Sequence, residues 1–175
     1  MNKSEIRKKI LKIRKINNNK NQKINFKSLI EILRKSKITG RVIGGYYPYN
    51  YEVGSKEIFR KLEKLNYNLT LPKISKNYQM DFFQWSTKDP LEINKYGIPE
   101  PVSDVIKLPD ILLVPLVAFD KNRNRIGYGG GFYDRYIKKI SKIKKCLTIG
   151  LAFSHQKVNE IQIENFDMKL DLIFT

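Results

Sequence analysis

The chain has 175 residues, 41% of them apolar, which suits one domain with a sizeable hydrophobic core and excludes a disordered tail. Basic residues number 34 and acidic residues 17, so the net charge is +17 and favours an anionic partner. No apolar stretch reaches the length of a membrane span, and none follows the basic N-terminus as in a signal peptide. With one Cys and one His, the chain can form neither an internal disulfide nor the usual zinc sites. We therefore expect a soluble, cytoplasmic protein.

Two basic helices are predicted over residues 4–37. Ser4 can cap the first helix, whose apolar face includes Ile6 and Ile10. A polar break follows at residues 17–23, and Thr39 with Gly40 ends the second helix. Residues 1–40 carry ten Lys and three Arg against two Glu, so most of the positive charge lies here.

Strands and helices alternate in the rest of the chain. Further helices are predicted after a Ser55 cap and from about Phe132, and residues 86–104, with three prolines, are predicted to be a long loop. Pro72 places its strand at an edge of the sheet or near its own end. The predicted strands cover residues 41–47, 68–74, 80–85, 111–119, 146–153 and 171–175.

This alternation predicts a single three-layer α/β/α domain over residues 1–175, with the basic helices of residues 4–37 packed on it. The sheet is expected to be mostly parallel, with right-handed crossovers between its strands. Ligands of such sheets bind beyond the carboxyl ends of the strands.

Residues 120–135, DKNRNRIGYGGGFYDR, carry the clearest chemical signal. Four glycines lie within five positions, between a buried strand and a helix, where bare backbone and a helix N-terminus suit a phosphate. Arg125 and Arg135 flank the glycines, and Asp134 could hold Mg²⁺ beside a phosphate. The spacing is that of neither a P-loop nor a dinucleotide fingerprint, so a tight turn without a ligand is the alternative.

Motifs along nearly the whole chain resemble the 5-formyltetrahydrofolate cyclo-ligase family. The resemblance lies in the order of six signals, of which RIGYGGGFYDR after VPLVAFD is the clearest. The others are KSEIR from Lys3, YYPYNYE ending at Glu52, Leu71 with Pro72, Trp85 with GIPEP from Gly97, and a tail with Gln156, Asp167 and Asp171.

The resemblance implies an ATP- and Mg²⁺-dependent enzyme that cyclises 5-formyltetrahydrofolate to 5,10-methenyltetrahydrofolate. ATP would phosphorylate the formyl oxygen, N10 would attack the activated carbon, and phosphate would leave. Such chemistry needs positioning and charge neutralisation more than a protein nucleophile. The expected partners are these small molecules alone, with neither nucleic acid nor membrane, and the chain is expected to be a monomer.

The resemblance also implies residue roles. Catalytic roles fall to Arg125 and Tyr133, and Mg²⁺ ligation to Asp134 and Asp167. The folate would contact Tyr47, Glu52, Tyr128, Gly129, Gly130, Gly131 and Phe132. ATP would contact Lys3, Ser4, Glu5, Ile6, Arg7, Arg125, Ile126, Gly127, Tyr128, Gly129, Gly130, Gly131, Phe132 and Tyr133.

Each role has a structural alternative. Lys3 to Arg7 could be an exposed helix face, Asp134 a helix-dipole partner, Asp167 a loop cap and Glu52 a solvated loop residue. Trp85 could stack on a ligand or pack in the core.

Two departures from the family pattern concern loop geometry. Arg123 stands where the family usually has Gly, which predicts a different turn, and Glu52 is followed by Val53, Gly54 and Ser55 in place of the more usual acidic residue and Thr.

Two other functions remain open. One is a nucleic-acid-binding protein, although Phe26 is the only aromatic residue among residues 1–40 and no stacking platform interleaves the basic residues. The other is a catalytically altered ATP- or phosphate-binding α/β domain, against which the retained Glu52, Asp134 and Asp167 argue.

Overall fold

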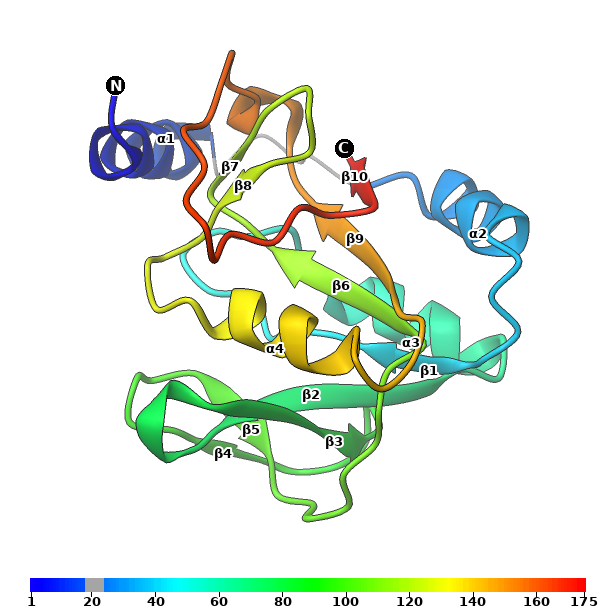
Figure 1. The fold of residues 1–175 in the computed structure, drawn as a ribbon. Coiled ribbons are helices and arrows are strands. Elements are labelled where there is room, and N and C mark those ends of the chain that lie inside the picture. The colour runs from blue at the N-terminus through cyan, green and yellow to red at the C-terminus, as the bar shows by residue number, and fades with distance from the viewer. Residues whose placement is uncertain (18–23) are drawn as a thin grey trace.

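The computed structural model describes residues 1–17 and 24–175, so the predicted polar break lies, apart from Asn17, outside the described residues. Six strands form the central sheet in the order β10–β9–β6–β1–β2–β3, and every neighbouring pair is parallel except β2 with β3 (Figure 1). This confirms the predicted, mostly parallel sheet. The strands are β1 (Val42–Gly44), β2 (Asn68–Ile74), β3 (Met80–Trp85), β6 (Ile111–Pro115), β9 (Leu147–Leu151) and β10 (Leu172–Phe174).

Helices cover both faces of this sheet. In Figure 1, α4 (Phe132–Ile140) lies in front of it, whereas α2 (Phe26–Lys35) and α3 (Lys56–Lys64) lie behind it. Successive residues of β6 serve the two sides, because Leu112 packs in the cluster of α4 and Leu113 in the cluster of α2 and α3. The three-layer α/β/α prediction is confirmed.

The first helix, α1 (Lys3–Asn17), packs at one end of the sheet and not on its face. Ile6 and Ile10 share a small apolar cluster with residues of β7 (Ala118–Phe119) and β8 (Arg125–Ile126). Asn2, not Ser4, caps this helix: its Oδ1 accepts from the Glu5 backbone N–H at 2.9 Å, and its own N–H donates to Glu5 Oε2 at 3.0 Å. Among the described residues, no helix is long and apolar enough to cross a membrane.

The apolar run of residues 111–119 is not one strand. It leaves the sheet after Pro115, and β7 then pairs with β8 in a separate antiparallel ribbon. At this break, side-chain hydrogen bonds replace the backbone hydrogen bonds of the sheet. Gln156 Nε2 donates to the carbonyls of Leu116 and Val117, and Gln156 itself lies in the short helix η2 (Ser154–Gln156).

The predicted loop of residues 86–104 contains an antiparallel hairpin of β4 (Leu91–Ile93) and β5 (Pro99–Pro101), so that prediction is wrong. The reason is tertiary: buried Glu100 accepts hydrogen bonds from the Ile74 N–H at 2.9 Å and from Asn94 Nδ2 at 2.7 Å. These bonds fix the hairpin against β2, which the short helix η1 (Lys76–Tyr78) follows.

Pro72 and the end of α2 also differ from expectation. Pro72 does not lie in an edge strand, because the edge strand is β3. However, β1 pairs with β2 only as far as Thr70, so Pro72 has a neighbouring strand, β3, on one side alone. The helix α2 ends at Lys35, capped by Ser36, ahead of the predicted Thr39 and Gly40.

Candidate active site

The site lies where the strand order of the sheet reverses. From β1 the chain moves to β2 on one side, and then to β6, β9 and β10 on the other, so the reversal falls between β1 and β6. Such a switch point opens a crevice at the carboxyl ends of the strands. The segments that leave β1 and β6 at this end meet α1 and the glycine-rich loop of residues 127–131.

The segment after β1 contains a tight turn of residues 49–52. The Glu52 N–H donates to the Tyr49 carbonyl at 3.1 Å, and the two central residues, Asn50 and Tyr51, have positive φ angles of 44° and 60°. Glu52 Oε2 accepts a hydrogen bond from the Tyr49 N–H at 2.9 Å. The turn thus folds the Glu52 carboxylate back over its own backbone.

Glu52 has unusual electrostatics. Burial raises the pKa of its carboxyl to about 7, although the Tyr49 hydrogen bond and the Arg14 charge act to lower it. Burial, together with the Glu52 charge, also raises the pKa values of Tyr46, Tyr128 and Tyr133. A half-buried carboxyl that titrates near neutrality beside three phenols is a typical binding-site group.

The glycine-rich loop is held against α1. Arg7 Nε donates to the Gly127 carbonyl at 2.7 Å. Gly129 and Gly131 have φ angles of 102° and 64°, and Gly131 is the N-cap of α4, so the loop bends sharply into the start of that helix. Tyr128 packs edge-on against Tyr49, with ring centroids 5.7 Å apart, which joins the loop to the turn after β1.

Two ion pairs stand beside this loop. Arg125 Nη2 donates to Asp134 Oδ1 at 2.8 Å, and Arg125 Nη1 donates to the Met168 carbonyl. Lys3 Nζ lies 2.5 Å from Asp167 Oδ2 and 3.4 Å from Glu164 Oε1. The Met168 N–H also donates to Asp134 Oδ1 at 2.9 Å, so one short tail segment connects both pairs.

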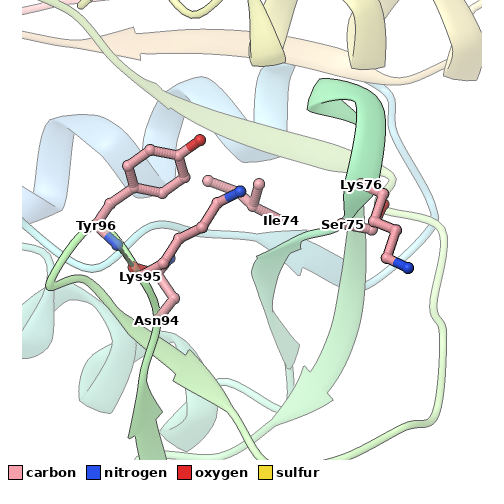
Figure 2. A pocket seen from close by; sticks show the side chains of 6 residues that line it. All are labelled: Ile74, Ser75, Lys76, Asn94, Lys95 and Tyr96. Atoms are coloured by element: carbon pink, nitrogen blue, oxygen red, sulfur yellow. Dashed lines mark hydrogen bonds between the residues drawn. The ribbon is translucent and has the colours of Figure 1, made fainter.

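A cavity of about 420 Å³ opens near the far end of the loop (Figure 2). Tyr96, Lys95 and Asn94 line one side of it and Ser75 and Lys76 the other, with Ile74 between them. The Tyr96 ring contacts that of Phe132, the first residue of α4, at 6.3 Å between centroids. Aromatic and basic groups therefore adjoin the glycine-rich loop here, and Lys95 and Tyr96 among them belong to the segment predicted as a long loop.

Comparison with known proteins identifies the family of the chain. A sequence model of the 5-formyltetrahydrofolate cyclo-ligase family matches residues 1–175. The chain belongs to that family.

Individual relatives extend the match. A 5-formyltetrahydrofolate cyclo-ligase of Haemophilus influenzae is 37% identical over 71% of this chain and 70% of its own length, and one of Mycoplasma pneumoniae is 30% identical over 99% and 98%. A solved 5,10-methenyltetrahydrofolate synthetase of Aquifex aeolicus has a TM-score of 0.77 at 29% identity, covering 99% of this chain and 89% of that one. The resemblance seen in the motifs is confirmed.

Other predicted site residues of this cyclo-ligase family member lie as follows. Tyr47 is exposed in the segment after β1, and Ser4 and Glu5 are exposed on α1, whereas Ile6 is buried in the α1 cluster. Trp85 is 7% exposed and packs edge-on against Phe59 at 5.9 Å, which favours core packing over ligand stacking.

Arg123 lies in a turn that suits glycine. Its φ angle is 68°, in the left-handed region that residues with a Cβ rarely adopt. Its Nη1 donates to the Asp171 carbonyl at 2.6 Å, a contact that glycine could not make.

Arg14 was not among the site residues predicted from the sequence. This side chain is 1% exposed and reaches both the turn after β1 and the glycine-rich loop. A signal was present: Arg14 lies four residues after Ile10, which lies four residues after Ile6, so all three share the buried face of α1.

Proposed function

We propose that the chain catalyses the ATP- and Mg²⁺-dependent cyclisation of 5-formyltetrahydrofolate to 5,10-methenyltetrahydrofolate, with release of ADP and phosphate. One observation supports this above the others: in a chain of this family, Arg7 of α1 binds the glycine-rich loop, and Lys3 of the same helix pairs with Asp167, a predicted metal ligand. A phosphate chain bound there would meet backbone N–H groups, a helix N-terminus and two basic side chains.

The basic side chains on the phosphate side of the site differ in how free their nitrogens are to bind a phosphate. Within the described residues Arg7 donates from Nε alone, to the Gly127 carbonyl, so its other nitrogens remain for a phosphate, and Lys3 would exchange Asp167 for it. Arg125 is buried, and both of its terminal nitrogens already donate within the protein. In our proposal Arg125 contributes its charge to the transferring phosphoryl group across a short distance.

The predicted metal ligands fit Mg²⁺ that arrives with ATP. Among the described residues, the hydrogen bonds that Asp134 accepts end on Oδ1 and those that Asp167 accepts end on Oδ2, which leaves one oxygen of each to bind the metal ion. The two charges are balanced by Arg125 and Lys3, and no cluster of three or more His, Cys, Asp or Glu occurs in the described part of the chain. Mg²⁺ commonly binds through one or two carboxylates plus substrate phosphates, and it would neutralise phosphate charge here.

The folate side would use Glu52 and the aromatic groups around it. An ionised Glu52 can accept hydrogen bonds from the amino and ring N–H groups of the pterin, with Tyr47, Tyr128 and residues 129–132 as neighbouring contacts. The cavity beside Tyr96 could take the aminobenzoyl-glutamate part, because Lys95 and Lys76 offer positive charge to its carboxylates.

In the proposed reaction the formyl oxygen attacks the γ-phosphorus and the bond to ADP breaks. The N10 lone pair then forms a bond to the formyl carbon, the carbon–oxygen bond breaks to release phosphate, and N10 loses its proton. The chain positions these groups and excludes water. Burial raises the pKa of Tyr133, so its hydroxyl stays protonated and can donate a hydrogen bond beside Asp134.

The test is conversion of 5-formyltetrahydrofolate by the purified chain, followed by the near-UV absorbance of the methenyl product. Product should form only with ATP and Mg²⁺ together, and ADP and phosphate should appear in equal amounts with it. Absence of product at every protein concentration would sink the proposal, and product without ATP would refute its phosphoryl step.

A pair of variants on one helix tests the ATP site. Lys3→Met should raise the KM for ATP about 10-fold or more, because a charge-assisted phosphate contact is lost. Lys8→Met, on the exposed face of the same helix, removes the same charge and should leave the KM unchanged. Equal effects of the two variants would point to the overall charge and away from a site at Lys3.

A further inference from the structure

Arg14 is a buried cation that joins three segments at the switch point. Its Nη2 donates to the Leu116 carbonyl, just beyond β6, at 2.6 Å. Its Nη1 donates to the Asn50 carbonyl, in the turn after β1, at 3.2 Å and to the Tyr128 hydroxyl, in the glycine-rich loop, at 3.1 Å. One guanidinium on α1 thus bridges the segments that leave the two strands flanking the crevice.

No carboxylate neutralises this group at close range. Among the described residues none lies within ion-pair distance of Arg14, and its buried Nε has no hydrogen-bond partner in that part of the chain. Burying a charge without a partner is unfavourable, and an apolar side chain would fill the same place on α1 at lower cost. The packing of α1 therefore does not explain why an arginine occupies this position.

The turn that Arg14 holds is under strain. Asn50 and Tyr51 both have positive φ angles; Asn adopts such angles readily, but Tyr does so only when its surroundings impose it. Two bonds impose it from outside the turn: Arg14 donates to the Asn50 carbonyl, and the Tyr128 hydroxyl donates to the Tyr49 carbonyl at 3.4 Å. Arg14 contacts both the turn and that hydroxyl, so it fixes the whole arrangement around Glu52.

We propose that Arg14 is a positioning residue for folate binding, which holds the 49–52 turn and Tyr128 in place and so aims Glu52 at the pterin. Within the glycine-rich loop it contacts the Tyr128 hydroxyl, which faces the 49–52 turn, and it has no hydrogen bond to Lys3, Arg7 or a backbone group of that loop among the described residues, so its main effect falls on the folate side. The inference rests on the proposed role of Glu52 in folate binding.

Arg14 also acts on Glu52 through its charge. The groups that face this carboxyl are Arg14 from α1, Tyr46 and the Tyr49 N–H from the segment after β1, Tyr128 from the glycine-rich loop and Tyr133 from α4. Arg14 is the one cation among them that lowers the pKa of Glu52. Without the Arg14 charge, the effect of burial on the pKa of Glu52 is less opposed. That pKa therefore rises, and Glu52 ionises only at higher pH.

The experiment compares Arg14→Met, Arg14→Lys and Lys12→Met, the last removing a charge from the exposed face of the same helix. Arg14→Met should raise the KM for 5-formyltetrahydrofolate about 10-fold or more, change that for ATP by less than about 3-fold, and move the pH midpoint of kcat/KM for the folate upward. Arg14→Lys should keep the wild-type midpoint and recover part of the KM. Lys12→Met should match the wild type.

A double-mutant cycle with Tyr128→Phe covers the case in which Arg14→Met does not fold. Arg14→Lys and Tyr128→Phe should each raise the folate KM, and their combination should raise it by less than the product of the two effects, since both act through one contact. Independent effects, or an equal rise in both KM values with an unchanged pH midpoint, would overturn the proposal. A wild-type chain without turnover would instead contradict the function itself.

Discussion

Asp134 and Arg125 form a buried ion pair whose two members have different exposure. The side chain of Arg125 is 4% exposed and that of Asp134 25%, with 2.8 Å between Nη2 and Oδ1. Asp134 therefore neutralises a cation that has little access to water, in addition to any role toward Mg²⁺. A substitution of Asp134 must change stability as well as activity.

We predict that Asp134→Asn lowers the free energy of unfolding by about 2–3 kcal/mol, because Arg125 stays buried without a counter-charge while partial exposure of Asp134 moderates the loss. Urea denaturation measures this, and Asp104→Asn, whose side chain is 95% exposed, is the matched control with no expected change. Turnover should fall at least about 100-fold in Asp134→Asn. Full stability with lost turnover would contradict the structural role given to the ion pair.

The raised pKa of Glu52 predicts a pH dependence of folate use. The carboxyl is protonated below about pH 7 and accepts pterin N–H groups only when ionised, so kcat/KM for the folate should rise as pH increases through about 7. Glu52→Gln should remove this step and lower kcat/KM by about 10–100-fold. A wild-type step that persists in Glu52→Gln would assign the titration to another group.

The raised pKa of Glu52 affects stability in the opposite direction: stability falls, whereas folate use rises, as the pH increases. Because the folded-state pKa lies above the ordinary value of 4.5, Glu52 stabilises the free protein fully at low pH, and this contribution is lost as pH rises from about 4.5 through about 7. Glu52→Gln should flatten that part of the profile of unfolding free energy against pH. An unchanged profile would argue against burial as the cause.

The glycines of the loop differ in what they tolerate. Gly129 has a φ angle of 102°, which strains any side chain, whereas a Cβ at Gly127 meets nothing within 4 Å and its φ is ordinary. Gly129→Ala should cost about 1–2 kcal/mol and raise the KM for ATP, and Gly127→Ala should stay within about 0.5 kcal/mol of the wild type. Thermal unfolding of the two variants checks this order, which the reverse ranking would refute.

Arg123 combines strain with a useful contact. Arg123→Ala keeps the positive φ and loses the bond to the Asp171 carbonyl, so it should destabilise the protein by about 1 kcal/mol. Arg123→Gly loses the same bond but relieves the strain, and should melt above Arg123→Ala. If the alanine variant melts higher, the left-handed turn is not a source of strain.

Cys146 should react slowly. Burial raises the pKa of its thiol to about 12, so roughly 10⁻⁴ of it is thiolate at pH 8. Its rate with a disulfide reagent should increase about 10³-fold on unfolding in urea. Similar rates in the folded and unfolded protein would contradict the burial.

The sequence predicted those parts of the fold in which local pattern and tertiary burial agree. The apolar run from Ile111 indicated a central strand because β6 is buried on both faces, and the glycines before Phe132 indicated the start of α4. The break after Pro115 was not predictable, since the residues beyond it are equally apolar, and the β4–β5 hairpin depends on buried Glu100, whose partners lie outside the strands that it joins.

The candidate site was predictable where residues form a motif, and not where it depends on a meeting of distant segments. The glycine-rich loop and Asp134 are close in sequence, so their proximity followed from the pattern. Arg14 stood among many lysines and arginines of a basic helix, and only its place on the buried face set it apart. The cavity beside Tyr96 required the hairpin, which the sequence did not indicate.

The position of α1 has a consequence for the order of assembly. Its contacts join residues far apart in the chain: Lys3 with Asp167, Arg7 with Gly127 and Arg14 with Leu116. Such contacts carry the largest loop-closure cost, and α1 adds only a small apolar cluster of its own. We therefore expect α1 to be the last helix to dock and the first to detach when the protein opens locally. In amide hydrogen exchange α1 should lose protection while the β6–β9 ladder keeps it. Under mildly denaturing conditions, enzyme activity should therefore be lost while the sheet is still folded.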